Sequence, residues 1–492
     1  MTISTAIDAA AVARVVGIKT EFEDLQTGAR FLPQRVAVVG QGISGGTYTT
    51  TKRQVTSASE AGTIYGFGSP VHLAVSQLLP VNGDGVGSVP VTVYPLADAA
   101  TGVAATGTIT PVISETVATS YRVSVSGILS QEFIVNPGDS AATVTAAITT
   151  AINAVIDMPV TAVDGTTVVN LTTKWEGTSA NDVTVEVLGN GGSTFTLVQP
   201  AGGLVNPDVD VALNQIGDVW ETMIINCLDV ADTASLDKFS TFNEGRWQAL
   251  NAKPLVVFSG STEADLNTAI TLPDSRKTDR TNVQVNAPGS NNLPFVVAAR
   301  ASARVAVIAA NNPSRDYGAQ QMTGINTGLD GQQWTYVQQD TAVKAGAATT
   351  IVANGVMEVA DMVTMYHPDG EAPPAYRYVC DIVKLQNIIY SLGLIFAAPR
   401  WNGAPLIPDN QATVNPDAKR PKDAKGEIFA LLDSLGLNAV ISDVDFAKAN
   451  TVVGINSMNP KRLDISVTLK LAGNTNIRSI DLNFGFYYGL AA

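Results

Sequence analysis

Apolar runs in the middle of the chain alternate with helix-like sequence. The runs are MIINCLD, PLVVFSG and NVQVNAP, and the helices expected after them span 235–252, 262–270 and 294–311. Thr262 with Asp265 approximates a capping box at the start of the second helix. A strand followed by a helix, repeated, is typical of βαβ units. This part of the chain is therefore predicted to form a largely parallel sheet.

The segment from about Ala97 to Gly203 has a different pattern. It contains one helix-like stretch, Ser140–Ile156, among the strand-like runs YRVSVSG, QEFIVNP, TTVVNLTTKW, NDVTVEVLG and STFTLVQ. It also holds 2 Lys/Arg against 9 Asp/Glu, or −7, half of the net charge of the chain. These features predict a compact, autonomous α+β insertion.

The C-terminal end alternates apolar and polar residues with a period of two. Such a pattern predicts two half-buried strands, each with one apolar face. The first apolar series is Leu463, Ile465, Val467, Leu469 and Leu471, and the second is Ile480, Leu482, Phe484 and Phe486.

The remaining elements complete a multidomain α/β and α+β fold. A hairpin is expected at Asn354-Gly355, because that dipeptide favours a tight two-residue turn. The other predicted strands are Val15–Phe22, Arg35–Gly40 and Val89–Tyr94, and the other predicted helices are His72–Leu79, Ala375–Ala397 and Glu427–Leu435.

The motif GQGISG, Gly40–Gly45, follows a buried strand and satisfies the GxGxxG pattern of dinucleotide-binding enzymes. Such a site also needs a helix that starts at the glycine turn and an acidic residue after the next strand. TYTTTKRQVT follows instead, and Glu60 lies in SASEAG, which is typical of a helix start. A glycine-rich turn is therefore favoured, with a nucleotide- or NAD-binding enzyme as the alternative.

Catalytic and metal-binding groups are scarce. His72 and His367 lie far apart without ligand spacing, and the only cysteines, Cys227 and Cys380, indicate buried free thiols. The acidic pairs Asp208/Asp210 and Asp443/Asp445 are expected in turns or helix caps, since neither belongs to a calcium loop. No catalytic residue, metal or cofactor is predicted.

Composition narrows the possible partners. The net charge is −14 and only 15% of the 492 residues are charged, while 45% are hydrophobic. An acidic chain argues against nucleic-acid binding, and a neutral surface suits a protein that contacts copies of itself. The apolar stretch 295–310 is interrupted by arginines, and the stretch 388–398 is too short to cross a bilayer. The N-terminus lacks the pattern of a signal peptide, so neither membrane insertion nor export is expected.

The order of motifs resembles the tail sheath family of contractile phages and related injection machines. The segment Ile64–Leu96, IYGFGSPVHLAVSQLLPVNGDGVGSVPVTVYPL, has the family's glycine turn, helix, Asn-Gly loop and strand in sequence. The resemblance covers Val15–Leu96 and about Gln215–Tyr488, and the inserted segment is similar to sheath insertions. A surface-layer or capsid-like protein, the other alternative, shares the composition but not these motifs.

The resemblance implies a non-enzymatic subunit that polymerises as a helical stack of six-membered rings around a tail tube protein. Baseplate and tail terminator proteins are the other implied partners, and the implied location is a virion tail assembled in the host cytoplasm. The expected divisions are an N-terminal arm (1–22), a first sheath part (23–96), the insertion (97–203), a βαβ sheath domain (204–370) and a tube-facing C-terminal domain (371–492).

Two sets of residues are candidate contacts. The basic cluster Lys419, Arg420, Lys422 and Lys425 is either a solvated loop or, as the resemblance implies, a tube contact. The terminal strands either close their own domain or pair with neighbouring subunits, as family arms do. The intersubunit set is Val15, Val16 and Ile18 with the nine alternating C-terminal residues, Leu463 to Phe486.

Overall fold

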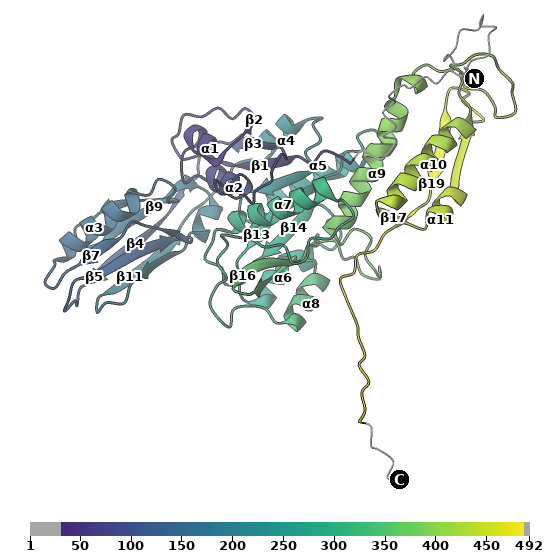
Figure 1. Ribbon diagram of the computed structural model, residues 1–492. Helices are drawn as coiled ribbons and strands as arrows, with labels where there is room; N and C mark the ends of the chain where they lie inside the picture. Colours follow the sequence, from purple (N-terminus) through teal and green to yellow (C-terminus); the bar gives the residue numbers. More distant parts are fainter. Residues whose placement is uncertain (1–30, 487–492) are drawn as a thin grey trace, which may run out of the picture. The chain divides into compact units, whose positions relative to one another are not determined.

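The computed structural model describes residues 31–486 and divides into two compact units (Figure 1). One unit comprises residues 31–394 and 471–486, and the other residues 395–470. The mixed α/β, multidomain architecture predicted from the sequence is confirmed. The predicted residues Val15, Val16 and Ile18 lie outside the described part of the chain, and the predicted domain boundaries stay predictions.

A six-stranded sheet is the centre of the larger unit. Its strands are β1 Val36–Gln41, β2 Arg53–Val55, β3 Val91–Leu96, β12 Met223–Asn226, β13 Val256–Ser261 and β14 Asn282–Asn286. Their order is β14-β13-β12-β1-β3-β2, and only β2 is antiparallel to its neighbour. Every residue of the five parallel strands is buried, as expected for a parallel sheet covered on both faces.

Helices cover both faces of this sheet. They are α1 Ala58–Tyr65, α2 Pro70–Leu78, α4 Asp210–Ile216, α5 Thr233–Trp247, α6 Leu266–Ser275 and α7 Pro294–Asn311. Val36 and Val38 share a core with α2 and α7, whereas Ala37 and Val39 share one with α4 and α5. The helix α6 is capped by Asp265, which accepts from the Thr268 amide, so the expected cap at Thr262 is wrong.

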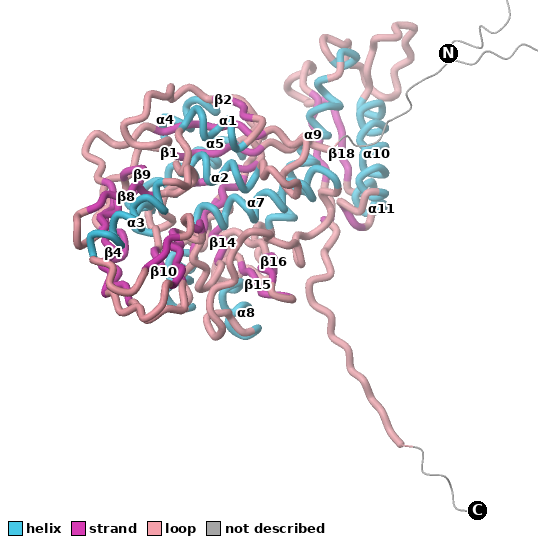
Figure 2. The backbone as a smooth tube through the Cα atoms, turned by 60° about the vertical axis from the view of Figure 1, so that its left-hand side comes forward, coloured by secondary structure: helices cyan, strands magenta, loops and turns pink. Residues whose placement is uncertain are grey.

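The inserted segment forms two four-stranded sheets with one α-helix, α3 Ala141–Asn153, and the short 3-10 helix η1 Thr178–Asp182 (Figure 2). One sheet holds β4 Ala104–Val112, β8 Val160–Asp164, β9 Val169–Glu176 and β11 Thr194–Ala201. The other holds β5 Thr119–Val125, β6 Ile128–Leu129, β7 Phe133–Val135 and β10 Val185–Leu188. The sequence missed β4 and β8 as strands. One apolar core continues from these sheets into the central sheet, and the expectation of an autonomous insertion stays a prediction.

Two helices and a hairpin complete the larger unit. They are α8 Tyr336–Lys344, the hairpin of β15 Thr349–Ala353 and β16 Val356–Asp361, and α9 Val379–Ala397, whose last residues belong to the smaller unit. Positive φ angles at Asn354 and Gly355 form the predicted turn.

By length and composition, α7 and α9 could each cross a membrane, but 67% and 50% of their apolar windows are buried within the protein. The apolar residues 388–397 form the second half of α9, which begins four residues later than the predicted helix Ala375–Ala397 and ends where predicted.

The smaller unit is built on a helix and short strands. It contains η2 Pro399–Trp401, α10 Pro421–Leu437, β17 Ile441–Ser442, α11 Val444–Ala449, β18 Thr451–Ile455 and β19 Leu463–Val467, and the two-residue strand β20 Lys470–Leu471 ends it. β19 pairs antiparallel with β18, so the first alternating series does form a strand. The predicted second strand, at 480–486, has no strand partner within the described chain.

Candidate functional site: the glycine turn and the assembly surfaces

The glycine turn after β1 is packed shut. The Gly42 amide donates to the Tyr48 hydroxyl at 3.1 Å, and the Ile43 amide donates to the Tyr65 carbonyl at 2.8 Å. A Cβ on Gly42 would lie 2.4 Å from the Tyr48 ring, so glycine is needed here for close packing. Amides that would bind a pyrophosphate in a dinucleotide site are therefore already used within the protein.

The inserted segment fills the crevice that such folds use for ligands. Within the sheet, β1 lies between β3, which follows it early in the chain, and β12, which follows much later, so the strand order reverses at β1. Ligands usually bind at this reversal, beyond the carboxyl ends of the strands. Here the Ser44 amide donates to the Lys174 carbonyl at 2.7 Å, and Gln41 Nε2 donates to the Glu176 carbonyl at 2.8 Å. Backbone carbonyls of β9 therefore accept hydrogen bonds at the position where a ligand would bind in such folds.

Glu60, the acidic residue with the spacing of a ribose ligand, already accepts hydrogen bonds within the protein. Glu60 lies in the first turn of α1 and accepts hydrogen bonds from the amide and hydroxyl of Thr56, both at 2.9 Å. These bonds, led by the one from the Thr56 amide, lower the pKa of the Glu60 carboxyl. It therefore supports a helix start, as the sequence predicted.

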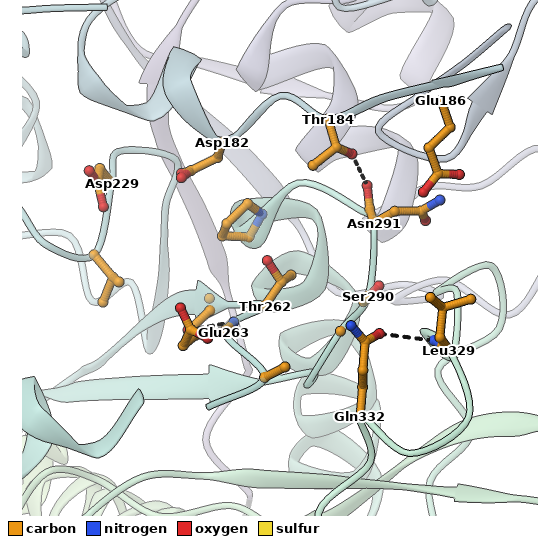
Figure 3. Close-up of a pocket in the computed structure, with 16 residues that line it drawn as sticks. Asp182, Thr184, Glu186, Asp229, Thr262, Glu263, Ser290, Asn291, Leu329 and Gln332 are labelled. Atoms are coloured by element: carbon orange, nitrogen blue, oxygen red, sulfur yellow. Dashed lines mark hydrogen bonds between the residues drawn. The ribbon is translucent and has the colours of Figure 1, made fainter. Parts of the chain in front are cut away.

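The pocket shown in Figure 3 lies at the carboxyl ends of β13 and β14 and has a volume of about 500 Å³. Four carboxylates line it, from Asp182, Glu186, Asp229 and Glu263, and none of the described lining residues is lysine or arginine. Burial, and then the nearby charge of Asp229, raise the pKa of Asp182 to about 7. Because carboxylates repel phosphates, the pocket does not suit a nucleotide.

The remaining candidates for chemistry have structural partners. His72 Nδ1 accepts from the Gly68 amide at 3.1 Å, and His367 Nδ1 lies 2.8 Å from the Met365 carbonyl. Asp443 caps α11 by accepting from the Phe446 amide at 3.1 Å. Asp208 and Asp210 both pair with Lys238, at 2.6 and 2.9 Å. Residues 31–486 contain no cluster of three or more His, Cys, Asp or Glu side chains suited to a metal ion.

The basic cluster does not form the uniform loop that the sequence suggested. Pro421 begins α10, so Lys422 and Lys425 lie on its first turns. Of the four side chains only Lys422 is exposed, while Lys419, Arg420 and Lys425 are half-buried. Arg420 donates to the Gln411 carbonyl at 3.1 Å and thereby holds the preceding loop. Lys422 is therefore the most accessible of the four, and a contact of this cluster with a tail tube stays a prediction.

The C-terminal segment of the described chain exposes a run of apolar side chains. Every residue from Thr475 to Phe486 is exposed, and the segment is drawn as loop in Figure 2. Its large apolar side chains are 77–84% exposed, namely Ile477, Ile480, Leu482, Phe484 and Phe486. The interpretation of the second series as a hairpin strand closing its own domain is therefore wrong.

Sequence reasoning missed Lys384, the cation that holds the start of this segment. Its signal was a single lysine within the apolar run VCDIVKLQNII of α9. A charged side chain in such a run is rarely buried without a specific partner.

Fold and surfaces together define a multidomain α/β protein with a closed glycine turn and an exposed apolar segment near its C-terminus. No protein-family model matches the chain. Over 450 residues it is 24% identical to the Mu-like prophage FluMu tail sheath protein of Haemophilus influenzae, a match that covers 88% of each protein. The resemblance to tail sheath proteins inferred from the motifs is thereby confirmed.

Solved structures with a similar course of the chain are also sheath proteins. The sheath tail protein of Desulfitobacterium hafniense is 13% identical with a TM-score of 0.47, over 92% of this chain and 100% of that one. That of Listeria innocua is 12% identical with a TM-score of 0.49, over 91% and 94%. Similarity at this level is too low to define a function.

Proposed function

We propose that this chain is the subunit of a contractile tail sheath, which polymerises around a tail tube and contracts to drive the tube through a host envelope. One observation carries the proposal. Residues 475–486 of a chain related to a tail sheath protein expose an alternating apolar series that has no strand partner within its own described fold. A segment of this kind is stabilised when it adds to the sheet edge of another copy.

Strand exchange would link copies without locking them rigidly. Backbone hydrogen bonds between an extended segment and a sheet edge persist while the folded bodies rotate about the linker. A sheath assembled in an extended lattice can therefore shorten as its subunits rotate and bury new surface. Kinetic barriers would hold the extended lattice until a baseplate releases the first ring.

The remaining surfaces have parts in this proposal. The acidic insertion faces outward, where repulsion between copies is weakest. Lys422 and Lys425 on α10 face the tail tube, through contacts that salt would screen. Stacked six-membered rings, a baseplate and a tail terminator complete the assembly in a virion tail built in the host cytoplasm, and the subunit binds neither nucleic acid nor membrane. It has no enzymatic activity.

Negative-stain microscopy of the purified full-length protein tests the proposal. Hollow tubes with a regular repeat are expected at high protein concentration. Protein that stays monomeric at every concentration, both alone and with its tail tube, would contradict the proposed function.

A further inference from the structure

Lys384 is a buried cation on the apolar helix α9. Its side chain is 0% exposed. Lysine is almost never buried to this extent unless partners compensate its charge. The partners of Lys384 therefore indicate what the residue is for.

Two of its three bonds go to the start of the C-terminal segment. The ammonium donates to the Ala472 carbonyl at 2.6 Å, to Asn474 Oδ1 at 2.6 Å, and to Asp381 Oδ1 at 2.9 Å. These bonds use all three donors of a lysine. Asn474 also donates from Nδ2 to the Ser314 carbonyl at 2.8 Å, which ties the same point to the chain after α7.

Attachment ends abruptly beyond this point. Asn474 is half-buried, whereas every residue from Thr475 to Phe486 is exposed. A free segment held at one point sweeps a limited volume, and its effective concentration near an adjacent acceptor is correspondingly high.

We infer that Lys384 is a clamp that fixes where the C-terminal segment leaves its own fold and holds that point when a second copy of the chain takes up the segment. Delivery to a second copy rests on the proposed function, whereas the clamp itself does not. Release of the segment would leave the ammonium with Asp381 as its one remaining partner within residues 31–486, and a buried charge with too few partners is strongly disfavoured. Tension on the segment is thereby transmitted to α9.

The chain offers a direct probe of the clamp. Cys380 Sγ lies 3.6 Å from Asn474 Oδ1, so Asn474→Cys places a second sulfur next to a native one. In this variant Lys384 keeps the Ala472 carbonyl as an acceptor. We expect a disulfide between Cys380 and the introduced cysteine to form under mild oxidation of the dilute full-length monomer, as measured by non-reducing electrophoresis and peptide mass spectrometry.

Removing the ammonium should slow this reaction. Lys384→Met in the Asn474→Cys background is expected to lower the rate of disulfide formation roughly tenfold, the factor for loss of one charge-assisted hydrogen bond. The matched control is Lys344→Met, which removes a 69% exposed lysine paired with Asp340 on α8 and should leave the rate unchanged. Equal rates with and without Lys384 would overturn the clamp.

A second variant keeps the test valid if Lys384→Met does not fold. Asn474→Ala leaves the lysine in place but removes one of its acceptors. Tryptic cleavage after Lys470 should then accelerate relative to cleavage after the exposed Arg478, which serves as the internal reference. An unchanged ratio would overturn the clamp. Both tests use monomers, so failure of the sheath proposal would show separately, as absence of tubes in the microscope.

Discussion

The indole of Trp175 packs edge-to-face against the ring of Phe295, with centroids 6.1 Å apart. Trp175 lies near the end of β9 and is fully buried, and Phe295 lies in the first turn of α7. This contact joins the inserted sheets to the α/β core. It explains why the two share one apolar interior.

Trp175→Ala should therefore destabilise the whole larger unit by about 3–5 kcal/mol, the usual cost of truncating a buried tryptophan. Urea denaturation measures the change. Val163→Ala on β8, where the side chain is 60% exposed, is the matched control and should change little. A tryptophan variant as stable as its parent would show that the insertion contributes little to the core.

The closed glycine turn predicts the effect of Tyr48→Phe. The tyrosine hydroxyl accepts from Gly42 and donates to the Leu96 carbonyl at 3.0 Å, so its loss leaves two groups without this partner. We expect a loss of stability of about 1–3 kcal/mol. Calorimetric titration with NAD should show no binding to the parent or the variant. Saturable binding that Tyr48→Phe alters would restore the dinucleotide interpretation.

The raised pKa of Asp182 predicts a pH dependence of stability. The folded state holds a proton up to about pH 7, whereas an unfolded aspartate releases it at pH ~3.9. Unfolding therefore releases a proton within this window, and the contribution of Asp182 to stability falls as pH rises from about 4 to 7.

Asp182→Asn should remove this contribution. From pH 4 to pH 8, the free energy of unfolding of the variant relative to that of the parent is expected to rise by about 2–4 kcal/mol. Glu186→Gln, an exposed carboxylate in the same pocket, is the control and should follow the parent. Parallel curves for the parent and Asp182→Asn would contradict the prediction.

Removal of residues 475–492 should separate folding from assembly. The truncation keeps β18, β19 and the Lys384 partners, so the monomer should melt within a few degrees of the parent. It should form no tubes in negative stain, because the apolar series is lost. A chain lacking only residues 487–492 is the control, and normal tubes from the longer truncation would refute strand donation.

Charge reversal on α10 tests the proposed tube contact. Lys422→Glu with Lys425→Glu should weaken co-sedimentation with the tail tube, and most strongly at low salt. Arg420 is left intact because its side chain donates to the Gln411 carbonyl of the preceding loop, whereas Lys422 makes only a longer side-chain bond to that loop, 3.4 Å to the Asp409 carbonyl. Lys461→Glu, an exposed lysine elsewhere in the smaller unit, is the control. Unchanged binding would show that Lys422 and Lys425 are solvated surface residues that do not contact the tube.

Local patterns determined much of this protein. An apolar run predicted β1, helix-like sequence predicted α7, and the Asn-Gly dipeptide predicted the turn at Asn354-Gly355, because backbone preferences act over a few residues. The motif order predicted the relation to tail sheath proteins, which the relative from Haemophilus influenzae confirms. The absence of a helix directly after GQGISG likewise followed from its threonine-rich continuation, within the described chain.

Only the tertiary structure showed which residues far apart in the sequence contact one another. The sequence could not show that Lys174 and Glu176 fill the crevice beside β1, because those contacts join residues more than 100 positions apart. Nor could alternation alone distinguish β19, which pairs within the chain, from residues 480–486, which do not. Both have one apolar face, and only the position of an available sheet edge determines which of them is covered.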